Sequence, residues 1–207
     1  MEKTSRKTLG VVLMASLIAL IAAPGLGSTP AQALTDNEVV TVSGTVDQAL
    51  TFAVSTTTIA FGTLSSTASR YANTTTGSAS DTIAHTMTLA TNSGSGYSIS
   101  VQGATLTSGG FTITAIGSTP ATASTGTEQF GIYATKSGGV NGTIDATYAT
   151  ASSFGYDATA TTSATFATGS SATQTETYSL HYLANISATT EAGSYSTGLT
   201  YVATANF

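Results

Sequence analysis

The chain has 207 residues, a formal net charge of −5, no cysteine and no tryptophan. The lack of cysteine excludes disulfides and attachment of a lipid through a thiol, and after residue 33 the only basic residues are Arg70 and Lys136. Because binding to nucleic acid or to an anionic membrane needs Lys and Arg opposite the phosphates, the sequence predicts neither kind of partner.

Residues 1–33 have the pattern of a cleaved signal peptide. A basic start precedes an apolar run over 9–23, and a small-x-small cleavage motif follows at 31–33, which is the order found in secretory signals. The apolar run has about 15 residues, fewer than the roughly 20 that span a bilayer, although an uncleaved anchor is the alternative. We expect a secreted, extracellular protein at the cell surface, with one domain over 34–207. The basic residues at the start are Lys3, Arg6 and Lys7.

The first predicted element is a strand over 38–46, where Val40, Val42, Gly44 and Val46 fall on one parity. Alternation of this kind is typical of a strand with one apolar face. Two interpretations stay open. The segment is the first strand of its own domain, or it is donated to another molecule by strand addition, in which main-chain bonds provide affinity and side-chain pockets provide specificity. The chain has few Lys and Pro residues to protect its sheet edges, which favours such pairing.

The rest of the chain alternates apolar and polar residues and is rich in threonine, a β-branched residue that favours strands. Helical periodicity is absent after residue 33, and glycine and asparagine at 92–96 predict a hairpin. We expect an all-β, antiparallel, immunoglobulin-like sandwich of about 7–9 strands, with a closed barrel as the second possibility. The strands predicted after the first are 49–54, 57–61, 82–91, 96–103, 111–116, 130–135, 176–186 and 194–206.

Three other stretches are poor in large apolar residues. The stretches 63–80 and 117–128 are predicted to be surface loops. The low-complexity stretch 150–175 is either a long loop or one or two irregular strands.

The sequence offers little material for catalysis. His85 and His181 are the only histidines, an activated hydroxyl needs a base within hydrogen-bonding reach, and no Gly-x-Ser-x-Gly motif is present. His85 shares a parity with Ile83 and Met87, which favours a packed core histidine. We therefore predict a protein that is not an enzyme, with no catalytic residue, no cofactor and no metal site.

Two surface features remain open. The pattern Asn-x-Ser/Thr, which is the acceptor for N-linked glycans, occurs at 73–75, 141–143 and 185–187, although such matches arise by chance in a chain so rich in Ser and Thr. Four tyrosines are expected to be exposed, where they could stack on sugar rings. They are Tyr71, Tyr133, Tyr148 and Tyr156.

Three short motifs carry a family resemblance: Phe61-Gly62 within 58–64, the hairpin end 95–101, and the Glu-Ala-Gly-Ser-Tyr turn at 191–195 with the predicted strand 199–203. Together they resemble secreted bacterial surface proteins with an immunoglobulin-like sandwich, namely the spore-coat-U-like pilin subunits and the WxL-type surface proteins. The chain lacks the Trp-x-Leu signature of the second group and the disulfide common in the first.

The resemblance implies a non-catalytic cell-surface structural or adhesive protein, in the form of a pilin-like subunit that assembles by strand addition. Its partners would be other copies of itself or other surface proteins. The alternative is a carbohydrate- or cell-wall-binding sandwich module, with cell-wall or host polysaccharide as the partner.

Overall fold

The computed structural model describes residues 36–158 and 163–207, so the predicted signal peptide lies outside the described residues. The chain divides into two units, Met1–Gly44 and Thr45–Phe207. In the described part of the first unit, residues 36–44 are exposed and have no regular secondary structure. Across the described residues all regular elements are strands, and no helix there is long and apolar enough to cross a membrane.

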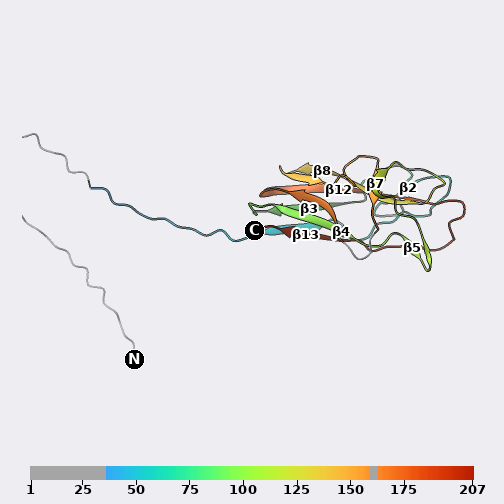
Figure 1. Cartoon of the computed structure of the whole chain (residues 1–207), viewed down its shortest axis with the longest axis horizontal. Coiled ribbons are helices and arrows are strands. Elements are labelled where there is room, and N and C mark those ends of the chain that lie inside the picture. The colour runs from blue at the N-terminus through green and yellow to red at the C-terminus, as the bar shows by residue number, and fades with distance from the viewer. Residues whose placement is uncertain (1–35, 159–162) are drawn as a thin grey trace, which may run out of the picture. The chain divides into compact units, whose positions relative to one another are not determined.

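The second unit contains thirteen strands (Figure 1). In chain order they are β1 (Leu50–Val54), β2 (Arg70–Tyr71), β3 (His85–Thr91), β4 (Tyr97–Gln102), β5 (Thr107–Ser108), β6 (Phe111–Thr112), β7 (Gly117–Ala121), β8 (Gln129–Gly138), β9 (Gly142–Ile144), β10 (Phe154–Tyr156), β11 (Ala164–Gly169), β12 (Thr173–Asn185) and β13 (Thr200–Ala205).

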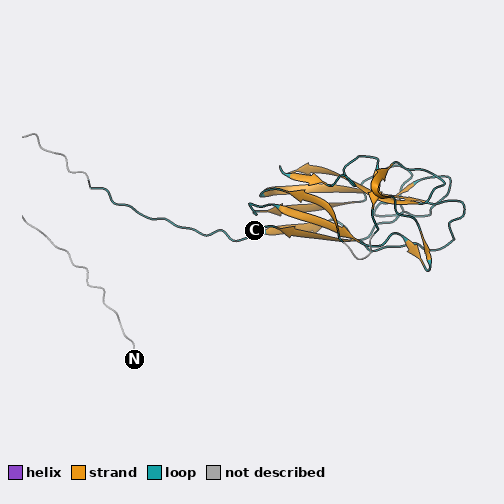
Figure 2. Ribbon diagram, in the orientation of Figure 1, coloured by secondary structure: helices purple, strands orange, loops and turns teal. Residues whose placement is uncertain are grey.

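The strands form two antiparallel sheets and a short hairpin (Figure 2). The larger sheet has the order β1-β3-β12-β8-β10-β7, with β2 also paired to β12, and the smaller has the order β13-β4-β11-β9. Both sheets are open, so the closed barrel is not what forms. The all-β, antiparallel, sandwich-like part of the prediction is confirmed.

The core lies between the inner faces of the two sheets. Residues of β3 and β4 alternate between buried and half-buried, so that Met87 and Leu89 on one sheet and Ile99 and Val101 on the other are almost fully buried. Phe166 of β11 crosses the interface, because its ring contacts aromatic rings of both sheets. This alternation explains why a period of two in the sequence produces two packed layers.

Most long strands form close to where alternation predicts them, as β1, β3, β4, β8, β12 and β13 show. Around 57–61 there is only one bridge, between Ala60 and Asn73, and of 111–116 only two residues form a strand. Conversely, β2 and β7 lie in the predicted loops, and the low-complexity stretch contributes β10, β11 and the start of β12.

The predicted first strand over 38–46 does not form. Residues 36–49 carry no strand and are all exposed, because no strand of the described residues pairs with 38–46 and β1 begins only at Leu50. Alternation alone cannot produce a strand without a neighbouring strand to accept its hydrogen bonds.

The two ends of the second unit differ in how tightly they are held. At one end the turn between β3 and β4 is hydrogen-bonded to residues near both the start and the end of the unit's chain. Asn92 donates from Nδ2 to the carbonyl of Asp47 at 2.7 Å and accepts from the N–H of Ala49 at 2.8 Å, and Ser93 donates to the carbonyl of Asn206. Gly96 closes the turn with φ +79°, where a Cβ would meet the Gly169 carbonyl. The turn predicted at 92–96 therefore forms, but the predicted hairpin is wrong, because β3 belongs to the larger sheet and β4 to the smaller, so this turn connects two sheets instead of two paired strands.

Candidate functional site

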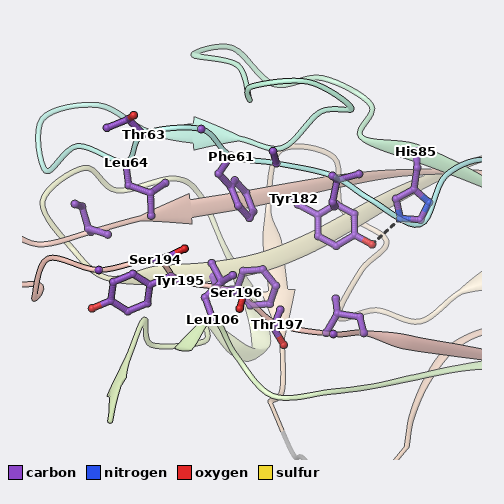
Figure 3. Close-up of a pocket in the computed structure, with 18 of the residues that line it drawn as sticks. Phe61, Thr63, Leu64, His85, Leu106, Tyr182, Ser194, Tyr195, Ser196 and Thr197 are labelled. Atoms are coloured by element: carbon purple, nitrogen blue, oxygen red, sulfur yellow. Dashed lines mark hydrogen bonds between the residues drawn. The ribbon is translucent and has the colours of Figure 1, made fainter. Parts of the chain in front are cut away.

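An open groove lies at the other end of the unit, where two segments that lie mostly outside the sheets face each other. One wall is the segment 54–64 that follows β1, and the opposite wall is the segment 190–201 that leads into β13. Its volume of about 1030 Å³ is at the upper limit for small-molecule pockets. Figure 3 shows Phe61 and Leu64 on one side and Tyr195 on the other.

The walls are held from behind rather than by each other. The first wall is fixed by paired backbone bonds between Ala60 and Asn73, at 2.8 and 3.0 Å, and by Arg70, whose Nε donates to the carbonyl of Phe61 at 3.0 Å. The second wall is fixed by the pair Ser196–Thr107, with both backbone bonds at 3.0 Å. Each wall therefore keeps its shape while the space between the walls stays open.

The groove floor is apolar except for one chain of hydrogen-bonded side chains. Leu106 and Phe130 belong to the buried core, and both line the groove. Beside them His85 Nε2 is hydrogen-bonded to the Tyr182 hydroxyl at 2.8 Å, which in turn is bonded to the Tyr201 hydroxyl at 2.7 Å. Figure 3 shows the bond between His85 and Tyr182.

His85 is neutral in this setting. Burial lowers its pKa, and the nearby backbone of Thr86 offsets only part of that effect. Its exposed fraction is 7 %, and Nδ1 is buried without a partner. The expectation of a packed core histidine is confirmed, and the residue adds no charge to the groove.

Unpaired backbone groups are the most distinctive feature of the walls. Among the described residues, the N–H groups of the half-buried Ile59 and Leu64 on one wall donate no hydrogen bond, and those of the half-buried Tyr195 and Leu199 on the other wall donate none either. Half-buried main-chain donors normally find a partner. An extended segment lying in the groove would supply the missing carbonyls, as in strand addition.

The four residues predicted for strand donation are not among the residues that line the groove. Val40, Val42 and Val46 belong to the exposed segment 36–49, with exposed fractions of 82–89 %. Gly44 in the same segment is surrounded by open space, because a Cβ added there would have no other atom within 4 Å. The apolar side chains of this segment are therefore exposed to solvent.

The second histidine lies on the outer face of the larger sheet. His181 Nδ1 is 2.8 Å from a carboxylate oxygen of Asp81, its ring stacks on Tyr133 at 4.2 Å, and the Tyr133 hydroxyl donates to the other oxygen of Asp81. These residues join a small second core with Phe154 and Leu183. The arrangement packs a loop against the sheet.

The expected sugar-stacking tyrosines are not exposed, so that prediction is wrong. Tyr133, Tyr148 and Tyr156 have exposed fractions of 4 %, 1 % and 1 %, and Tyr71 is half-buried. Their rings fill the core, and the Tyr156 hydroxyl donates to the Gly103 carbonyl at 2.7 Å. The sequence places Tyr71 in a predicted loop, Tyr133 in the predicted strand 130–135 and Tyr156 in the low-complexity stretch, and no local pattern there indicates that these rings turn inward.

A buried carboxylate that sequence reasoning missed closes the end opposite the groove. Glu176 on β12 has a fully buried side chain. Its oxygens accept hydrogen bonds from two tyrosine hydroxyls, one threonine hydroxyl and two backbone N–H groups, and Lys136 Nζ lies 3.8 Å away. The hydroxyl donors are Tyr97, Tyr178 and Thr173, and the backbone donors are Asn141 and Gly142.

These bonds decide the charge of Glu176. Burial by itself raises the pKa of a carboxyl group, but the hydrogen bonds from Tyr97, Tyr178 and Thr173 outweigh it and leave the Glu176 pKa below its ordinary value. The carboxylate is thus ionised and saturated with donors. Because Tyr97 belongs to the smaller sheet and Glu176 to the larger, this cluster joins the two layers.

Comparison with protein-family models, with curated proteins and with solved structures gives no match to this chain. Within the described residues, no group of three His, Cys, Asp or Glu side chains is placed to hold a metal ion. The groove is thus the feature from which a function is inferred.

Proposed function

We propose that this chain is a non-catalytic, secreted structural subunit of the cell surface, immunoglobulin-like in fold, which assembles by strand addition. In this proposal the signal peptide 1–33 is removed on export, and the segment 39–46 of one copy lies in the groove of the next. The observation that carries the proposal is the open groove with unpaired N–H groups on both walls.

The shape and chemistry of the segment suit the groove. Its eight residues span about 26 Å when extended, at about 3.3 Å per residue. Val40, Val42 and Val46 would direct their side chains toward the apolar floor, while the main chain pairs with the walls. Burial of three valines that are now exposed would stabilise the joint by about 1.5–3 kcal/mol each, before the cost of ordering the segment.

The positions of the groove and of the chain entry favour an open fibre over a closed dimer. Asp47 and Ala49 are fastened to Asn92 at the β3–β4 turn, whereas the groove starts at Val54. Leu50 pairs with Thr91 beside that turn, and β1 then leads about 13 Å away from it to Val54.

Figure 1 also shows that the two ends of the unit differ. Figure 1 shows the C-terminus at one end of the strands and β2 and β5 near the other. A subunit that extends a segment from one end and receives one at the other makes a head-to-tail contact, which continues without closing.

The first test uses parity. Val42→Asp places a charge on the apolar face of the segment, while Ser43→Asp places the same charge on the opposite face. We expect the wild type and Ser43→Asp to form fibres that electron microscopy detects, and Val42→Asp to stay monomeric on size-exclusion chromatography. Fibres from Val42→Asp, or equal loss in both variants, would contradict the proposal.

The second test uses complementation. Leu64→Arg blocks the groove but leaves the segment intact, and Val42→Asp does the reverse. Neither variant should polymerise alone, but an equal mixture should give one-to-one pairs, because only one joint can form. Pairs should be visible by native mass spectrometry, and a peptide of residues 38–47 should compete with them. A mixture that stays monomeric would refute this mode of assembly.

Export is tested separately. N-terminal sequencing of the protein from the culture medium or cell surface should begin at Leu34. A chain that stays inside the cell with Met1 intact would contradict the proposed location without bearing on assembly.

A carbohydrate-binding module is the second candidate, and the groove rim favours it. Hydroxyls of Thr63, Ser194 and Thr197 border the half-buried ring of Tyr195, and rings of this kind can stack on sugars. Retention of monomeric Val42→Asp on a polysaccharide column, lost in Tyr195→Ala, would support this candidate.

A further inference from the structure

The three Asn-x-Ser/Thr matches differ sharply in the environment of the asparagine side chain. An N-glycan acceptor must present its Nδ2 to the transferase, so a buried or hydrogen-bonded amide is a poor acceptor in the folded chain. The structure allows each of the three amides to be compared on this criterion.

Asn185 is excluded by burial. Its exposed fraction is 1 %, and its Nδ2 donates to the Ser124 carbonyl at 3.2 Å and to Gln129 Oε1 at 2.8 Å. Reaching this amide would require the end of β12 to open.

Asn141 is excluded by its partners. Its Nδ2 donates to Ser171 Oγ, and its backbone N–H and that of Gly142 are bonded to Glu176 Oε1 at 3.2 and 2.9 Å. The tripeptide is therefore part of the cluster that joins the two sheets.

Asn73 has the opposite arrangement. Its Oδ1 accepts from the N–H and the hydroxyl of Thr75, at 2.9 and 3.1 Å, and from the N–H of Gly77 at 2.8 Å. Its Nδ2 donates to no described residue and is not among the buried unpaired atoms, so it is open to solvent. Residues 74–76 beside it are exposed.

We propose that Asn73 is the one N-glycan acceptor of the folded chain, with a lipid-linked oligosaccharide as the donor. The hydroxyl of Thr75 and the two N–H groups hold the Asn73 amide through its oxygen and leave its nitrogen to react. The argument for this site does not use the proposed assembly, because the Asn73 side chain contacts neither the segment 39–46 nor the groove floor, although the Asn73 backbone holds one groove wall through Ala60.

The transfer balances as a substitution at the first sugar. Nδ2 of Asn73 forms a bond to C1 of that sugar, the bond from C1 to the diphosphate oxygen breaks, and the lipid diphosphate leaves with the electron pair. The Nδ2 proton passes to a base of the transferase. No oxidant or reductant is required.

The test uses the folded full-length chain with a purified oligosaccharyltransferase and a fluorescent lipid-linked oligosaccharide. Intact mass should rise by one glycan, and peptide mapping should place it on Asn73. Peptides covering 69–79, 137–147 and 181–191 should all be modified, which would show that the fold makes the selection.

Matched variants complete the experiment. Thr75→Ala should abolish transfer to the folded chain, and Thr75→Ser should retain it. Thr143→Ala and Ser187→Ala should leave the mass increase unchanged. A folded chain that gains no glycan, or that gains one on Asn141 or Asn185, would overturn the proposal.

Discussion

The two ends of the strand-bearing unit satisfy their polar groups in opposite ways. At the closed end, which we define by Glu176 and the β3–β4 turn, a buried carboxylate accepts five hydrogen bonds and ties the sheets together. At the open end, which we define by the groove between 54–64 and 190–201, backbone N–H groups on both walls stay unpaired.

The comparison shows that composition does not decide which end is closed. Both ends are rich in threonine, serine and glycine. The closed end is stable because donors from five positions converge on one acceptor, whereas at the open end no segment of the described residues accepts from the wall N–H groups. We therefore expect stability to depend on the first end and assembly on the second.

The largest expected effect comes from removing the carboxylate at the closed end. Glu176→Ala leaves buried hydroxyls and N–H groups without an acceptor, and we expect the free energy of unfolding to fall by about 3–5 kcal/mol. Urea denaturation followed by circular dichroism measures this. Glu38→Ala, in the exposed segment, should stay within about 0.5 kcal/mol of the wild type. A loss below 1 kcal/mol in Glu176→Ala would show that the cluster does not hold the sheets.

The next effect is alkaline unfolding, which involves both ends. Burial raises the pKa of Tyr97 and Tyr178 at the closed end and of Tyr182 and Tyr201 at the open end above the ordinary value of 10.0, and it raises that of Tyr156 to about 12. The contribution of these neutral tyrosines to the free energy of unfolding is complete below pH 10, and it is lost as the pH rises through their pKa values in the folded state. Phenolate absorbance near 295 nm should therefore appear together with loss of the strand signal above pH 10. Titration of these tyrosines in a folded protein would contradict their burial.

A smaller effect on the acid side distinguishes the closed end. The pKa of Glu176 is lowered in the folded state. Its contribution to the free energy of unfolding is therefore present above the unfolded-state pKa of about 4.5, and it is lost as the pH falls through the folded-state pKa. The slope of stability against pH below 4.5 should be shallower in Glu176→Gln than in the wild type. Identical slopes would mean that the carboxylate does not titrate with folding.

The smallest effect on stability is expected at the open end. Leu64 is half-buried on a groove wall, so Leu64→Ala should cost only about 1 kcal/mol while fibre formation falls strongly. Thermal unfolding and electron microscopy on the same sample measure the two effects. A variant that loses several kcal/mol would show that the open end supports the fold, and the contrast between the ends would disappear.

The sequence allowed the long strands to be predicted, since Met87, Leu89, Ile99 and Val101 alternate visibly and all turn inward. It could not place the groove. The two walls were noticed as short motifs at 58–64 and 191–203, but more than 120 residues separate them, and only the packed sheets bring them opposite each other. The buried acceptor Glu176 was missed for the same reason, because its donors come from distant strands and turns.

The tyrosines show the limit most directly. Tyr148 and Tyr156 lie in stretches of small polar residues, so local pattern predicts exposure, yet both are 1 % exposed. Phe166, in the same low-complexity stretch, connects the two layers. Large rings in a chain of small residues become core because few other side chains can fill the space between the sheets.

By itself the sequence determined that this unit is built from antiparallel strands, because alternation and β-branched residues act through the geometry of a few consecutive residues. The tertiary structure alone decided that 38–46 stays unpaired, that one end closes around Glu176, and that the other end stays open. Those outcomes depend on pairing and burial between residues far apart in the chain, which no local pattern encodes.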